Sequence, residues 1–125
     1  MNEDLRNNKT LEERILYSEK LLNKYPDRIP VIIEKSKRDK SNILLDSSKC
    51  KYLIPRHLHV SQLIFLIRKN IQIDSNKAIF IFVDNILVPN NSDIETIYHN
   101  HKDLDGFLYV SYSCESTFGF QVTQQ

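Results

Sequence analysis

The sequence predicts a single α+β domain in which helices cover a β-sheet, and three observations support this class. The chain has 125 residues, enough for one hydrophobic core, with 41% hydrophobic and 26% charged residues. Several segments repeat apolar residues at the 3.6-residue period of a helix. Others are short runs rich in β-branched and aromatic residues, which are typical of strands.

The first expected element is a helix that begins at Leu11. Thr10 and Glu13 have the spacing of a capping box, in which each side chain bonds to the other residue's backbone N–H. Pro26 marks the end of this helix. Its rough apolar stripe consists of Leu11, Ile15, Leu16, Leu21, Leu22 and Tyr25.

Two strands are expected next. Both alternating sets of side chains in residues 28–35 are mostly apolar, which predicts a strand that is covered on both faces. A polar, basic stretch follows, and residues 50–55 form the second strand. Because proline cannot donate to a sheet ladder, Pro55 at its end favours a position at the sheet edge.

Residues 60–71 form the clearest helix, with apolar side chains along one face and Phe65 opposite. Residues 78–83 then read as a buried strand, residues 93–101 as a short helix and residues 106–114 as the last strand. A strand pair, a crossing helix and two further strands form a β-grasp fold with a mixed four-stranded sheet. The N-terminal helix is an addition that would cover the second sheet face.

Six stretches stand in the order and spacing of one known family. They are residues 25–31 (YPDRIPV), 51–55 (KYLIP), 66–69 (LIRK), 77–83 (KAIFIFV), 101–110 (HKDLDGFLYV) and 115–119 (ESTFG). The chain thus resembles the autophagy-related-eight family of ubiquitin-like modifiers, which includes the GABA-receptor-associated proteins and microtubule-associated light chains. It departs from many members at Tyr17, at Asn70 and in a longer segment at 36–48.

The resemblance implies three parts of the chain: an N-terminal helical segment at 1–26 packed on the sheet, a ubiquitin-like β-grasp core at 27–114 and a flexible C-terminal tail at 115–125. It also implies conjugation at Gly119, between Phe118 and Phe120. A lone tail glycine would otherwise be interpreted as a linker residue. Without a side chain, however, glycine can pass through a narrow enzyme channel and present its carbonyl.

On this resemblance, a cysteine protease removes residues 120–125, and activating and conjugating enzymes join Gly119 to the amine of phosphatidylethanolamine. The covalent lipid is the only added group expected. Because two acyl chains hold a protein on a membrane while one is marginal, this lipid would anchor a chain that has no apolar run of about 18 residues. The predicted location is therefore the cytoplasm, and after lipidation an autophagosomal or other organelle membrane.

A second site is expected along residues 51–55, where alternation sorts the neighbouring side chains into two sets. The resemblance implies that each set receives one anchor of an aromatic-x-x-aliphatic motif in a receptor or adaptor. Pocket one would comprise Leu21, Pro30, Ile32, Lys51, Leu53 and Phe107. Pocket two would comprise Tyr52, Ile54, Pro55, Leu58, Leu63 and Leu66. The alternative is that most of these residues only form the core.

Four basic residues could attract acidic residues around such a motif: Arg28, Lys49, Lys51 and Arg68. The sequence gives little support for nucleic-acid binding, metal binding or catalysis. A net charge of +1 gives no general attraction to nucleic acid. The paired histidines at 57, 59, 99 and 101 lack the third and fourth ligands of a metal site. Neither Cys50 nor Cys114 lies in a nucleophile motif, so catalytic residues are not expected.

The sequence thus favours a monomeric modifier that acts through lipid conjugation and receptor recruitment in autophagy. The alternative is an unconjugated β-grasp adaptor that binds peptides or cytoskeletal partners.

Overall fold

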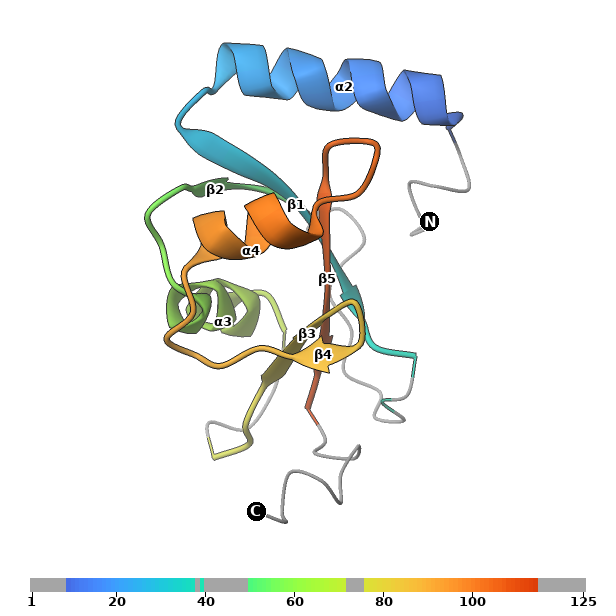
Figure 1. Cartoon of the computed structure of the whole chain (residues 1–125). Coiled ribbons are helices and arrows are strands. Elements are labelled where there is room, and N and C mark those ends of the chain that lie inside the picture. The colour runs from blue at the N-terminus through green and yellow to red at the C-terminus, as the bar shows by residue number, and fades with distance from the viewer. Residues whose placement is uncertain (1–8, 38, 40–49, 72–75, 115–125) are drawn as a thin grey trace.

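The computed structural model describes residues 9–37, 39, 50–71 and 76–114. Figure 1 shows α2 on one side of a twisted sheet and α3 and α4 on the other. The elements are α2 (Leu11–Lys24), β1 (Arg28–Lys35), β2 (Lys51–Pro55), α3 (Val60–Lys69), β3 (Phe80–Val83), β4 (Ile86–Leu87), α4 (Ile94–His101) and β5 (Leu108–Ser113). This order agrees with the predicted β-grasp arrangement and its added N-terminal helix.

The sheet is mixed, as expected, with strand order β2-β1-β5-β3-β4. β1 and β5 are parallel at its centre, and the other neighbours are antiparallel. It has five strands rather than the four expected, because the chain turns back after β3. Asp84 and Asn85 have φ of 54° and 64°, the geometry that a two-residue hairpin turn requires. At two residues, β4 is too short to show an alternating pattern.

β1 lies at the centre of the core and is buried on both faces, as its two apolar sets predicted. Ile29, Val31 and Ile33 are each 0% exposed and belong to the main cluster under α3 and α4. Pro30 and Ile32 alternate with them and are buried on the α2 side. Burying a side chain of this size stabilises the fold by about 1.5–3 kcal/mol.

Helix α2 begins with the expected capping box. The Thr10 backbone donates to the Glu13 carboxylate at 2.9 Å, and the Glu13 backbone donates to the Thr10 hydroxyl at 3.1 Å. The predicted apolar stripe is wrong at Leu16, whose side chain is 65% exposed, and its end members Leu11 and Tyr25 are exposed as well. The buried position is Ser18, where a small residue is needed because the loop before β5 passes close to the helix.

Ser18 also bonds that loop directly: its hydroxyl donates to the Asp105 carbonyl at 2.5 Å. Gly106 follows, with φ of +92° and no space for a side chain on the helix side. The chain can therefore pass beneath α2 only with a glycine at this position. These contacts fix the height of α2 above β1.

Candidate peptide-binding groove

Strand β2 is the edge of the sheet, as Pro55 suggested, and its backbone has a defined orientation. The Ile33 N–H donates to the Cys50 carbonyl at 2.8 Å, which makes this a hydrogen-bonded antiparallel pair. Because such pairs alternate with non-bonded ones, the backbone groups of Lys51 and Leu53 point away from β1. These outward groups could pair with an added strand.

The side chains of β2 alternate between the two sheet faces in the predicted sense. Lys51 and Leu53 lie opposite Ile32 and Pro30, on the α2 side. Tyr52 and Ile54 lie on the other face and contact the main core cluster. The β2 residues of predicted pocket one and those of predicted pocket two therefore lie on opposite faces of the same strand.

The floor of pocket one is present but covered. Phe107 is 0% exposed, Ile32 is 4% exposed and Pro30 is buried. Leu21 and Leu53 are half-buried, and only Lys51 is exposed. A partner side chain cannot contact the buried members of this set while α2 keeps its present side-chain arrangement.

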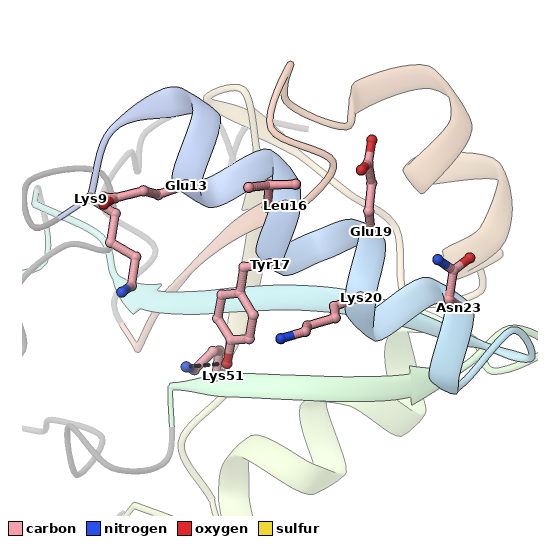
Figure 2. A pocket seen from close by; sticks show the side chains of 8 residues that line it. All are labelled: Lys9, Glu13, Leu16, Tyr17, Glu19, Lys20, Asn23 and Lys51. Carbon is pink, nitrogen blue, oxygen red and sulfur yellow. Dashed lines mark hydrogen bonds between the residues drawn. The ribbon is translucent and has the colours of Figure 1, made fainter.

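Tyr17, which the predicted set does not include, lies against one residue of this floor. Its ring packs edge-on against Phe107, with 5.7 Å between ring centroids and 60° between planes. Figure 2 shows its side chain reaching from α2 towards β2, where the Lys51 Nζ donates to the Tyr17 hydroxyl at 2.7 Å. The same Nζ lies 4.6 Å from the centre of the Tyr17 ring.

An open cavity of about 760 Å³ lies beside Tyr17 on the α2 side. Lys51 is the only predicted pocket residue among those that line it (Figure 2). Its lining consists of Lys9, Glu13, Leu16, Tyr17, Glu19, Lys20, Asn23 and Lys51. The accessible space is thus outside Tyr17, whereas the apolar floor of pocket one is beneath it.

Pocket two divides into a buried half and an accessible half. Ile54 and Leu63 are each 1% exposed and are core residues. The other four members are half-buried: Tyr52, Pro55, Leu58 and Leu66. Only these four residues of the predicted set are open to contact by a partner, and Ile54 and Leu63 pack beneath the surface.

Asn70, the C-cap of α3, holds Tyr52 in place. Its side-chain amide donates to the Tyr52 hydroxyl at 2.9 Å and to the Leu66 carbonyl at 3.0 Å. Burial raises the pKa of the Tyr52 phenol above its ordinary value, and the bond from Asn70 partly offsets this. At neutral pH Tyr52 is therefore an uncharged, positioned ring, suited to an apolar pocket.

The basic residues that were predicted to attract acidic partner residues lie in different parts of the structure. The Arg28 guanidinium donates to the Leu53 carbonyl at 3.3 Å, and it therefore lies at the β2 edge. The Arg68 guanidinium donates to the Lys77 carbonyl at 2.5 Å, at the far end of α3. Lys49 lies outside the described residues.

The predicted conjugation site, Phe118, Gly119 and Phe120, also lies outside the described residues, which end at Cys114. The strand before it is anchored by a buried residue that the sequence interpretation missed. The Asp39 carboxylate accepts bonds from the Cys114 N–H at 2.7 Å and the Ser113 hydroxyl at 3.2 Å. Asp39 stands in a polar loop, where nothing in the local pattern distinguishes a buried carboxylate from a solvated one.

Cys114 has the environment of a packed thiol. Burial raises its pKa, the nearby Asp39 charge raises it further, and more distant cations oppose this. A thiol with a raised pKa carries little thiolate at neutral pH, which disfavours a nucleophilic role. Within the described ranges, His, Cys, Asp and Glu side chains do not form a group of three that could hold a metal ion.

None of the helices in the described part of the chain combines the length and apolarity required to cross a bilayer.

Comparison with known proteins identifies the family that has this fold. The sequence profile of a family described as "Autophagy protein Atg8 ubiquitin like" matches residues 13–119. Autophagy-related protein 8 of Schizosaccharomyces pombe is 51% identical over 110 residues, covering 88% of each chain. The protein of the same name from Mycosarcoma maydis is 48% identical over 119 residues, covering 95% of this chain and 98% of that one.

Among solved structures, the crystal structure of Trypanosoma brucei ATG8 superposes with a TM-score of 0.81 at 33% sequence identity. The superposition covers 89% of this chain and 93% of that chain. The profile match, the curated relatives and the shared fold agree over nearly the whole length: this chain belongs to the Atg8 family of ubiquitin-like autophagy proteins.

Proposed function

We propose that this protein is a lipid-conjugated modifier that is processed after Gly119 and recruits receptors through the β2 edge. The proposal of conjugation at Gly119 rests on the residue at which the family match ends. The profile extends to residue 119, and six residues, 120–125, follow it. This supports removal of that extension by a cysteine protease before activation and conjugation.

After cleavage, the activating enzyme joins the Gly119 carboxylate to the nucleoside monophosphate part of a nucleoside triphosphate, releasing pyrophosphate. An enzyme cysteine thiol then displaces the nucleoside monophosphate and forms a thioester with the Gly119 carbonyl. The amine of phosphatidylethanolamine then attacks this thioester, forming an amide and releasing the thiol. The attached lipid supplies two acyl chains, which suffice for stable membrane residence. The protein itself contributes the Gly119 carboxylate, which becomes the transferred acyl group, and the docking surface. The enzymes of the conjugation system supply the catalysis.

A lipidation assay in the source cells tests this half. Full-length chain and a chain that ends at Gly119 should both gain the mass of a phospholipid, and Gly119→Ala should not. Val122→Ala is the matched control, because it alters a residue that is removed and should be processed normally. A mature chain that retains residues 120–125 and stays unlipidated contradicts the proposal.

The receptor half rests on the edge position of β2, with its outward backbone at Lys51 and Leu53. A peptide that adds as a strand there would place alternate side chains toward pocket one and pocket two. Arg28 and Lys51 provide positive charge near the edge for acidic flanking residues. Two anchors and a few backbone bonds, less the cost of association, give a dissociation constant of about 1 μM.

The double variant Tyr52→Ala and Leu53→Ala tests the groove, because it changes one side chain on each face of β2. Calorimetric titration with an aromatic-x-x-aliphatic peptide should show binding lost, while circular dichroism shows the fold retained. Phe65→Ala is the control, since Phe65 is 62% exposed on α3 and belongs to neither pocket. Unchanged affinity in the double variant would remove the groove from the proposal.

The unconjugated adaptor predicts a different outcome in cells. Membrane association of Gly119→Ala would then persist, because binding alone would localise the protein. For the lipidated modifier it should disappear, while the purified variant keeps its affinity for the peptide.

A further inference from the structure

Tyr17 contacts two residues of the predicted pocket-one set, Phe107 and Lys51. Tyr17 and Leu21 are four residues apart, so they project from the same face of α2. Leu21 is a half-buried member of the predicted pocket-one set, and the Tyr17 ring packs against Phe107, another member of that set. Tyr17 therefore stands where an incoming aromatic anchor would have to stand.

The burial of the pocket-one floor is consistent with this position of Tyr17. Phe107 is 0% exposed and Ile32 is 4% exposed, so neither can contact a partner as the side chains now lie. An anchor that reaches Phe107 from the α2 side must first displace the Tyr17 ring.

Three interactions oppose that displacement. The Tyr17 hydroxyl accepts a hydrogen bond from the Lys51 Nζ at 2.7 Å. The same ammonium lies 4.6 Å from the ring centre, within cation–π range. The edge-on contact with Phe107 adds an aromatic pair. Each is individually modest, but all three are lost together when the ring leaves.

Lys51 connects the two states of the pocket. In the closed state its charge is directed at Tyr17. When the ring moves, the ammonium becomes available for an acidic residue of the partner. The residue that holds the cover closed is then the one that binds the peptide in the open state.

We propose that Tyr17 is a specificity-determining lid on pocket one, held closed by Lys51, which selects against large aromatic anchors. The inference rests on the proposed receptor-binding function and assigns to Tyr17 the choice among anchors. A peptide with a smaller aliphatic first anchor needs less displacement of the ring. The lid therefore shifts preference toward such anchors.

Calorimetric titration of the full chain tests this with two peptides that differ only at the first anchor, Trp in one and Leu in the other. Tyr17→Ala should bind the Trp peptide about tenfold more tightly than the wild type, with a smaller gain for the Leu peptide. Tyr17→Phe keeps the ring but loses the Lys51 hydrogen bond, and should gain about threefold to fivefold. The ratio of the two affinities is insensitive to partial unfolding.

Tyr25→Ala is the matched control. It also removes a tyrosine ring from α2's C-terminal end, but Tyr25 is 37% exposed and belongs to neither pocket. Both affinities should stay within about twofold of the wild-type values, the range of a neutral surface change.

A second readout follows the ring itself. Proton NMR of the free protein should show a nuclear Overhauser contact between the Tyr17 and Phe107 rings, which should vanish when the Trp peptide saturates the wild type. A contact that persists in the complex overturns the lid. So does a Tyr17→Ala variant that binds the Trp peptide no better than the wild type.

Failure of the groove is distinguishable from failure of the lid. If neither peptide binds the wild type or Tyr17→Ala, the receptor-binding function and the lid are both wrong. If both bind and the Trp-to-Leu ratio is the same with and without the Tyr17 ring, only the lid is wrong.

Discussion

The Arg14 guanidinium and the Asp105 carboxylate form an ion pair of 2.9 Å between α2 and the loop that precedes β5. The Asp105 side chain is fully buried and that of Arg14 is 13% exposed. The carboxylate also accepts bonds from the Tyr109 hydroxyl at 2.6 Å and the Phe107 N–H at 2.9 Å. This pair joins α2, and with it Tyr17, to the loop that leads into Phe107, one residue of the predicted pocket-one floor.

Arg14→Met should therefore destabilise the protein by about 3 kcal/mol, because removing one partner of a buried pair leaves the other charge uncompensated. Chemical denaturation measures the loss. Lys20→Met is the control: it makes the same kind of substitution at an exposed position on α2 and should cost less than about 0.5 kcal/mol. Equal stability of Arg14→Met and wild type would mean that Tyr109 and Phe107 satisfy the carboxylate without the cation.

Gly106→Ala should also be destabilising, by about 2–3 kcal/mol. A left-handed φ of +92° is costly for alanine, and the new Cβ would collide with the Ser18 hydroxyl and displace its bond to Asp105. Thermal or chemical unfolding measures the effect.

Two further variants separate the causes at Gly106. Adding Ser18→Ala should recover only part of the loss, because the Ser18 Cβ would still lie 3.1 Å from the new atom and the φ is unchanged. Gly119→Ala, which changes the other glycine of the chain, should leave the unfolding midpoint where it is. Full recovery in the double variant would make the collision, rather than the backbone, the whole effect.

Cys114 should react slowly with alkylating reagents in the folded protein. Its pKa is raised by burial and then by Asp39, so the pH midpoint of alkylation should lie above that of an exposed thiol. The measurement uses Cys50→Ser, which leaves Cys114 as the only thiol. Adding Asp39→Asn should lower the midpoint, since it removes the charge and keeps an oxygen for the Cys114 N–H.

The raised pKa of Cys114 also makes the stability of the folded protein depend on pH. The folded state holds the Cys114 proton more tightly than the unfolded state. The contribution to stability is therefore complete below the ordinary thiol pKa, and it declines as the pH rises from that value toward the raised one. A midpoint equal to that of an unstructured cysteine peptide would contradict the packed environment.

The predicted elements that matched the structure are those whose signal is local. The Thr10–Glu13 capping box set the start of α2 because both bonds form within one turn. The two apolar sets of β1 predicted burial on both faces, and Pro55 indicated the edge strand. β4 was missed because two residues cannot show a period, although Asp84 and Asn85 form its turn.

The groove was predicted only in part, for a related reason. Alternation placed Lys51 and Tyr52 on opposite faces of β2, and the register agrees. It could not show that Phe107 is inaccessible, because its burial involves packing against residues of other segments, Tyr17 among them. Asp39 and Ser18 were missed because both are polar residues whose burial is decided by distant partners.

The amino-acid sequence by itself determined the family, the order of the helices and of every strand except β4, and the glycine at which the family match ends, since these follow from motifs and periodicities along the chain. The tertiary structure alone decided which surfaces a partner can reach. Tyr17 and Lys51 are 34 residues apart, and they meet only because α2 packs across β1 at a height set by Ser18 and Gly106. Such contacts depend on packing between distant segments, and no local pattern encodes them.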